Sequence, residues 1–232
     1  MRNVVYLLVL LMCCACSKPT KLTILHTNDT HSQVEPKADN RGGYARRMGV
    51  IQRERAMDEH LLLVDAGDFC QGTPYFNYYK GRIEVEAMNR MGYDVVTLGN
   101  HEFDYKAEGL ANMLNTAVSS GDPIPAIVVC NVDWDAMENA GITDYQLLLQ
   151  EAFENYGIEE YIVVEKGDVK IAITGVFGED CLDCVPNCPL TFKDPVEAVK
   201  ETVEEIQEEE DQNDDFMSDF DQEYGDSDEE NE

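Results

Sequence analysis

Histidine, tryptophan and basic residues are scarce in this chain of 232 residues. It has 4 His, 1 Trp, and 17 Lys and Arg against 47 Asp and Glu, so its formal net charge is -30. The shortage of basic residues argues against nucleic acid as a partner, because binding a phosphate backbone depends on Lys and Arg. It does not exclude a small phosphate ester, since bound cations can supply positive charge locally.

Long apolar runs are also missing, apart from a short one near the N-terminus. Residues 4–12 follow Arg2 and are apolar except for Tyr6. This run is too short to span a bilayer, and residues 1–16 have the anatomy of a signal peptide. Cys16 follows Ala15 and precedes a polar segment, which predicts a lipid anchor on Cys16 in a bacterial cell envelope. Cleavage before Cys14, or an ordinary signal peptide of a secreted or periplasmic protein, is the alternative.

The rest of the chain alternates between short apolar runs and amphipathic segments. Expected strands cover residues 22–25, 61–64, 95–98 and 125–130, and expected helices cover 43–59, 83–91 and 108–118. Gly92 is the expected C-cap of the second helix, and residues 69–81 are expected to form a loop. A hairpin is expected over residues 161–175, followed by a helix that begins at Pro195 with Asp194 as its N-cap. This order predicts an α/β fold with a substantially parallel sheet.

The C-terminal segment contains no basic residue. From residue 204 to 232 there are 16 Asp and Glu and no Lys or Arg. Helical periodicity fails from Glu208, so residues 21–207 are expected to form the folded domain and residues 208–232 a disordered, solvated acidic tail. An interaction tail, or a reading frame cut or shifted near Glu210, is the alternative.

Three polar motifs follow the first three expected strands. They are His-Thr-Asn-Asp-Thr-His at 26–31, Asp-Ala-Gly-Asp at 65–68 and Gly-Asn-His-Glu-Phe-Asp at 99–104. The carboxyl ends of parallel strands meet at one edge of a sheet, so these motifs should converge. Carboxylate, amide and imidazole donors suit divalent cations, and paired cations are a common device for hydrolysing phosphate esters.

The stretches at 22–32 and 93–104 resemble the two signatures of the 5'-nucleotidase family of dinuclear metallophosphoesterases. The resemblance covers roughly residues 21–205. It implies the first half of a calcineurin-like four-layer αββα sandwich. It also implies hydrolysis of 5'-nucleotides or related phosphate esters with two divalent cations, which are Zn, Mn, Co, Mg or Ca.

The resemblance implies a role for each metal-binding side chain. Asp29 and His31 would bind the first cation, Asp68 would bridge both, and Asn100 would bind the second. Asp29 and His31 are also two residues apart after a strand, and period-two alternation would point both side chains the same way.

Two further residues of the third motif carry catalytic roles by the same resemblance. His101 would stabilise charge on the phosphate and assist the leaving oxygen, while Asp104 would orient that histidine. The implied reaction is in-line attack by a metal-bound hydroxide, without a covalent enzyme intermediate. Asp65, Glu102 and Phe103 are expected to be structural.

The family has further metal-binding histidines after its central signature, whereas no histidine follows His101 here. The second cation site is therefore expected to be incomplete, and the activity of the chain as given weak. The alternative function is an inactive fragment or a metal- or ligand-binding remnant of the family.

Cysteines form a second cluster, Cys181, Cys184 and Cys188. In an exported chain this spacing favours a disulfide between two of them over a zinc site, because no fourth ligand is close in sequence. Cys70 and Cys130 are expected to be buried free thiols.

Overall fold

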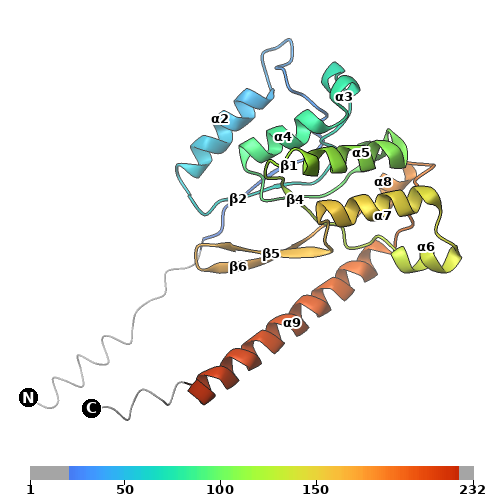
Figure 1. Ribbon diagram of the computed structural model, residues 1–232. Coiled ribbons are helices and arrows are strands. Elements are labelled where there is room, and N and C mark those ends of the chain that lie inside the picture. Colours follow the sequence, from blue (N-terminus) through green and yellow to red (C-terminus); the bar gives the residue numbers. More distant parts are fainter. Residues whose placement is uncertain (1–20, 225–232) are drawn as a thin grey trace, which may run out of the picture.

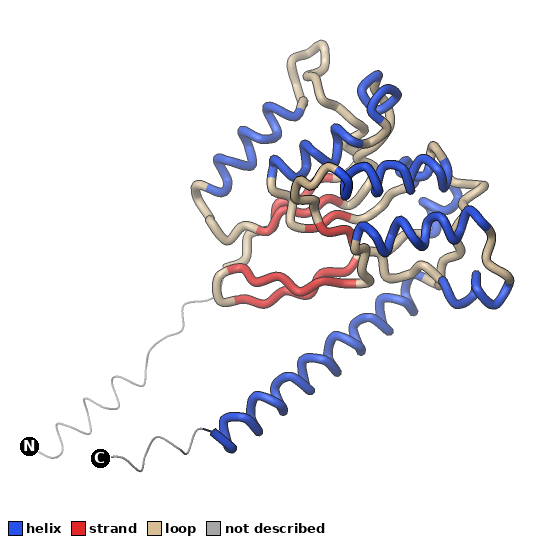
Figure 2. The backbone as a smooth tube through the Cα atoms, viewed as in Figure 1, coloured by secondary structure: helices blue, strands red, loops and turns tan. Residues whose placement is uncertain are grey.

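A four-stranded parallel sheet forms the centre of the computed structural model, which describes residues 21–224. The strand order is β1 (Ile24–Thr27), β2 (Leu62–Asp65), β3 (Val95–Val96) and β4 (Ala126–Ile127). Neighbouring strands are thus consecutive in the chain, and each connection contains at least one helix (Figures 1 and 2). The predicted α/β fold with a parallel sheet is confirmed.

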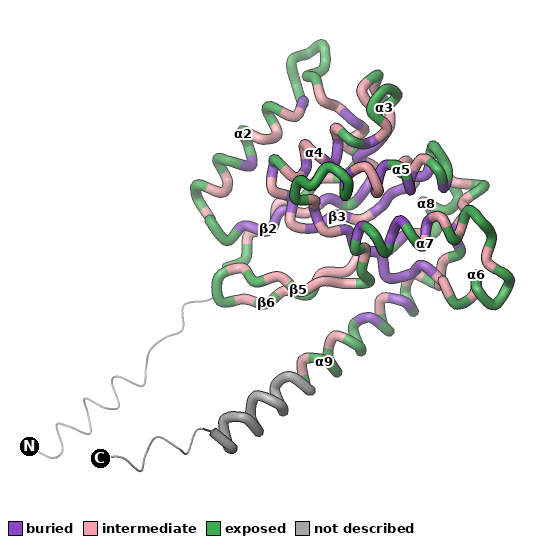
Figure 3. Tube along the Cα trace, in the orientation of Figure 1, coloured by how far each residue is buried: buried purple, intermediate pink, exposed green. Residues whose placement is uncertain are grey.

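Four longer helices pack around this sheet, and the expected ones begin and end close to their predicted bounds. They are α2 (Tyr44–Arg55), α4 (Arg82–Met91), α5 (Lys106–Ser119) and α7 (Asp144–Tyr156). Gly92 ends α4 with φ 73°, as a C-cap glycine does. Buried residues gather on β2 and β3 and along α4, α5 and α7 (Figure 3). This core holds the carboxyl ends of the strands in place.

The predicted hairpin is present as an antiparallel pair, β5 (Tyr161–Lys166) and β6 (Val169–Thr174), on the other side of the sheet from α4 (Figure 1). Lys166 joins it to the core through an ion pair with Asp94 at 2.7 Å. Helix α9 (Pro195–Tyr224) begins at Pro195 as expected and is capped by the Asp194 carboxylate.

Helix α9 extends beyond the end that the sequence predicts for it. The backbone is helical to Tyr224, so residues 208–224 of the segment expected to be disordered are helical. No Gly or Pro occurs between residues 196 and 224, and Glu and Gln favour helices. The loss of apolar periodicity from Glu208 therefore does not mark the end of this helix. The acidic residues after Tyr224 lie outside the described residues.

Several short elements differ from the sequence expectations. The predicted loop at 69–81 contains helix α3 (Pro74–Tyr79), in which Pro74 occupies the first helical position. The third motif contains a 3₁₀ helix, η1 (Asn100–Phe103). Helices α6 (Trp134–Ala140), α7 and α8 (Glu179–Asp183) were not predicted.

The five cysteines of the described residues are all free thiols. The expected disulfide among Cys181, Cys184 and Cys188 is therefore wrong for this structure, while the buried free thiols of Cys70 and Cys130 are confirmed. The predicted signal peptide and Cys16 anchor lie outside the described residues. Within the described part of the chain, no helix is long and apolar enough to cross a bilayer.

Candidate metal centre

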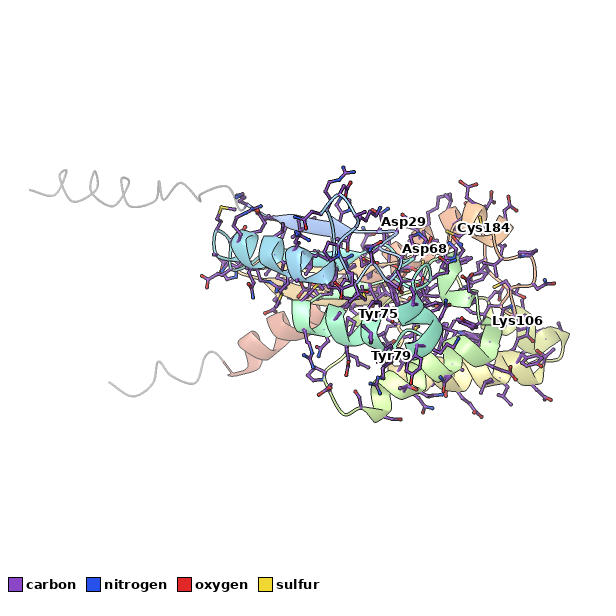
Figure 4. All side chains as sticks on the ribbon, turned by 90° about the horizontal axis from the view of Figure 1, so that it is seen from above. Asp29, Asp68, Tyr75, Tyr79, Lys106 and Cys184 are labelled. Carbon is purple, nitrogen blue, oxygen red and sulfur yellow. The ribbon has the colours of Figure 1, made fainter. Side chains whose placement is uncertain are left out.

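The loops after β1 and β2 are joined by backbone hydrogen bonds. The Asp29 N–H donates to the Gly67 carbonyl at 3.1 Å, and the His31 N–H donates to the Asp68 carbonyl at 3.0 Å. The first and second motifs therefore meet at the same edge of the sheet, as the parallel topology requires. In Figure 4, Asp29 and Asp68 lie at this shared edge of the molecule.

Turns, rather than extended backbone, aim these side chains. Asp29, His31 and Asp68 have φ values of 49°, 44° and 55°, in the left-handed region. Strand alternation is therefore the wrong explanation for how Asp29 and His31 point, because the strand ends at Thr27. Non-glycine residues with positive φ are uncommon and are enriched at functional sites.

One side chain from each motif converges on a common point. Ligand atoms of His31, Asp68 and His101 all lie within 4.8 Å of one another, and the three residues are half-buried. The two imidazole rings are 4.8 Å apart between centroids, in an edge-to-face arrangement. Two imidazoles and a carboxylate at this spacing match the donor preferences of a divalent transition metal. The described residues thus contain a donor set that fits one cation.

Of the other two predicted ligands, Asp29 lies beside His31, and Asn100 directly precedes His101 in the chain. Asp29 Oδ1 is 3.7 Å from His31 Nε2, and its side chain is 61% exposed and bonded to the Asn28 amide. Asn100 begins η1 and is half-buried. A cleft of about 670 Å³ is lined by Asp29 and His31, while Asp68 does not border it. The predicted ligands therefore do not all line one cleft.

His101 has two contacts that fix its position. Its Nδ1 lies 3.0 Å from Asp104 Oδ2, as the predicted orienting role of Asp104 requires. Its backbone N–H donates to Asp68 Oδ1 at 2.9 Å. The imidazole ring and the Asp68 carboxylate are therefore held in a fixed relation, and Asp104 orients the ring.

Glu102 joins the second and third motifs beneath the site. Its carboxylate accepts backbone N–H groups from Asp68 at 3.0 Å, Cys70 at 2.9 Å and Gly99 at 2.7 Å. Burial raises the pKa of Glu102 to about 7 in spite of these bonds. The structural role expected for Glu102 agrees with this geometry.

Two glycines allow the motifs to approach closely. A Cβ on Gly67 would lie 2.5 Å from the Gly99 nitrogen, and a Cβ on Gly99 would lie 2.3 Å from Asp68 Oδ1. No side chain fits at either position without moving backbone or the carboxylate. The absence of side chains at Gly67 and Gly99 therefore leaves space for the Asp68 carboxylate.

Cys181 and a group of basic residues lie near the site without having been predicted from the sequence. Burial raises the pKa of the Cys181 thiol, and the nearby Asp68 carboxylate raises it further. Cys181 comes from α8, more than a hundred residues after the second motif, so no local pattern signalled its place. Lys37, Arg46 and Arg47 line the cleft beside His31. These residues do not form a recognisable sequence motif, so they were not predicted to lie near the site.

Comparison with known proteins gives the family. The family model described as calcineurin-like phosphoesterase matches residues 22–228. The chain is 36% identical over 191 residues to the snake venom 5'-nucleotidase of Gloydius brevicauda, covering 78% of this chain and 30% of that protein. It is 32% identical over 194 residues to the trifunctional nucleotide phosphoesterase protein YfkN of Bacillus subtilis, covering 78% of this chain and 13% of that protein.

Solved structures agree with the sequence matches. The 5'-nucleotidase precursor of Thermus thermophilus superposes with a TM-score of 0.65 at 31% identity, covering 81% of this chain and 35% of that chain. The chain spans about a third of the length of the first curated relatives it matches. The predicted resemblance is confirmed, and the chain belongs to the calcineurin-like phosphoesterase family.

Proposed function

We propose that this chain carries a metal-dependent site for hydrolysis of phosphate esters, with 5'-nucleotides or related nucleotides as substrates. The observation that carries the proposal is the convergence of His31, Asp68 and His101 from three separate motifs. The names of the relatives support nucleotides as the substrate class.

His31 and Asp68 would hold one divalent cation, with Asp29 adding a third donor after a small movement of its exposed side chain. Asp68 and Asn100 would contribute to a second cation. When bound, such cations activate water and neutralise charge on the phosphate. The metal ions and their number are part of the proposal.

His101 and Asp104 are the proposed acid pair, so the His101 ring would lie beside the bound cation and would not be one of its ligands. Asp104 Oδ2 lies 3.0 Å from His101 Nδ1 and thereby fixes the orientation of the ring. The opposite nitrogen then carries a proton for the leaving oxygen of the ester. Asp68 contributes to this arrangement because it accepts the His101 backbone N–H.

The second cation has few donors in the chain as given. Asp68 and Asn100 offer two oxygens, and no histidine follows His101. Two oxygen donors compete poorly with water for a transition metal. We therefore expect weak turnover.

We also propose that the protein is exported and anchored in a bacterial envelope through Cys16, because the sequence of residues 1–16 has the pattern of a lipoprotein signal peptide.

Hydrolysis of AMP and p-nitrophenyl phosphate with added Mn²⁺ tests the proposed function. We expect slow phosphate release that stops with EDTA and falls at least about tenfold in Asp68→Asn, because the shared ligand is lost. The matched control is Asp122→Asn, an exposed loop residue that should keep the wild-type rate. Turnover that is independent of metal, or equal in Asp68→Asn and wild type, would contradict the proposal.

A further inference from the structure

A basic cleft adjoins the candidate metal centre. It has a volume of about 670 Å³ and lies between the loop before α2, the first turns of α2, and the residues Asp29 and His31. Of the residues that the structure describes, four with basic side chains line it, and Asp29 is the one carboxylate in the lining. The whole chain has 17 basic residues against 47 acidic ones. The local charge of this cleft is therefore opposite in sign to the net charge of the molecule.

The basic side chains of this cleft differ in whether a neighbouring carboxylate neutralises their charge. Arg41 is paired with Asp39, and Arg47 lies over the Tyr44 ring at 5.1 Å. Arg46 instead donates to neutral acceptors, the Asn40 side-chain oxygen at 2.5 Å and the Gly42 carbonyl at 3.4 Å. These bonds orient the Arg46 guanidinium without cancelling its charge, which leaves it free to bind an anion.

Lys37 lies in a turn that packs against the start of α2, and α2 carries Arg46. The Lys37 N–H donates to the Arg41 carbonyl, and the Asn40 N–H donates to the Lys37 carbonyl, both at 2.8 Å. Gly43 has φ 86°, and a Cβ there would lie 2.9 Å from the Pro36 nitrogen. This close approach holds the turn against the start of α2. The backbone that carries the basic side chains is therefore fixed in position.

We propose that this cleft is an anion subsite for a second phosphate of the substrate. The inference rests on the proposed function, because the reacting phosphate would lie at His31, Asp68 and His101. Asp29 and His31 line the cleft, and His31 also belongs to the metal centre, so a diphosphate group would extend from one region into the other. The volume exceeds that of a phosphate and admits the sugar attached to it.

The chemistry therefore favours substrates with two linked phosphates over simple monophosphates. Lys37 and Arg46 supply charge-assisted hydrogen bonds to the outer phosphate, and Arg47 adds to the positive field. A monophosphate reaches the metal centre alone and gains little from these side chains. The subsite thus discriminates by the number of phosphates, independently of the base.

Binding of inorganic pyrophosphate and inorganic phosphate to the metal-free chain tests the subsite. The measurement is isothermal titration calorimetry in EDTA, with wild type and the double variant Lys37→Gln/Arg46→Gln. We expect wild type to bind pyrophosphate about tenfold more tightly than phosphate, and the double variant to lose most of that preference. The control Arg53→Gln/Lys200→Gln changes the net charge equally at exposed sites and should keep the preference.

Amide NMR gives a second readout in the wild-type chain. Pyrophosphate should shift the Gly42 and Gly43 amide signals and leave those of Gly141 and Gly157, which lie outside the cleft lining, in place. Equal binding of the two anions by wild type, or equal weakening in both double variants, would overturn the subsite. Neither result bears on AMP hydrolysis, so the subsite and the proposed function fail separately.

Discussion

At the level of single residues, Asp65 is a buried carboxyl next to the candidate centre that serves the fold. Its oxygens accept the Thr27 hydroxyl at 2.5 Å and the Gly67 N–H at 2.9 Å. Burial raises the pKa of Asp65 to about 6, although these bonds oppose the shift. The structural role expected for this residue agrees with these contacts, and it makes folding depend on pH.

The sign of that dependence follows from the raised pKa. The folded chain keeps the Asp65 proton up to about pH 6, whereas the unfolded chain loses it near the ordinary aspartate pKa of 3.8. This contribution to stability is therefore complete below pH 4 and is lost as pH rises through 6. The difference between these two pKa values corresponds to at most about 3 kcal/mol of unfolding free energy.

We expect Asp65→Asn to lose this part of the pH dependence, because an amide does not titrate. Urea denaturation at pH 4.5 and pH 7 measures it for wild type, Asp65→Asn and the exposed control Asp122→Asn. Glu84 and Glu102 also have raised pKa values and stay in every variant, so the comparison isolates Asp65. The same pH dependence in Asp65→Asn and wild type would contradict the assignment.

The residues of the candidate centre could be predicted from the sequence to a large extent. His31, Asp68 and His101 were marked by short motifs at the ends of apolar runs, and the parallel topology brings them together. The contributions of Arg46 and Cys181 could not be predicted. Each depends on the path of a loop or helix that no local pattern records.

At the level of elements, the approach of the β2 and β3 loops depends on glycine. Gly67 has φ 95°, and the space for its Cβ is filled by the Gly99 backbone. Gly49 offers the contrast, because it lies in the exposed part of α2, where an added Cβ would meet nothing within 4 Å.

We expect Gly67→Ala to lower the unfolding free energy by about 1–3 kcal/mol or more, through backbone strain and collision with Gly99. Gly49→Ala should raise it by about 0.5–1 kcal/mol, since alanine is the better helix former. Urea titrations of both variants give the two values. A neutral Gly67→Ala would show that the two loops are not packed as described.

The elements differ in how well sequence predicted them. Helix α4 and Gly92 were predicted because an apolar face and a C-cap glycine agree. Helix α7 was missed although Thr143 and Gln146 form a capping box at its start, a signal that was present in the sequence. Strands β3 and β4 are shorter than their apolar runs, since residues such as Leu98 and Val129 are buried without pairing in the sheet.

At the level of the whole molecule, a strongly acidic chain concentrates its chemistry at one edge of its sheet. The net charge of -30 makes nonspecific cation binding a background for any metal measurement. Cysteines add another background for soft metals such as zinc. Manganese avoids the second problem because it prefers oxygen and imidazole donors to thiols.

The most direct test of the metal centre is titration with Mn²⁺ monitored by electron paramagnetic resonance, in wild type, Asp68→Asn and Asp122→Asn. The signal of the free ion disappears on binding. Adding 0.5 M NaCl suppresses weak association with surface carboxylates, because salt at this concentration screens charges beyond roughly 4 Å. We predict one tightly bound ion per chain in wild type and Asp122→Asn. Binding should be at least about tenfold weaker in Asp68→Asn, because the carboxylate between His31 and His101 is lost. Tight binding that survives in Asp68→Asn would show that the three motifs do not form the metal centre.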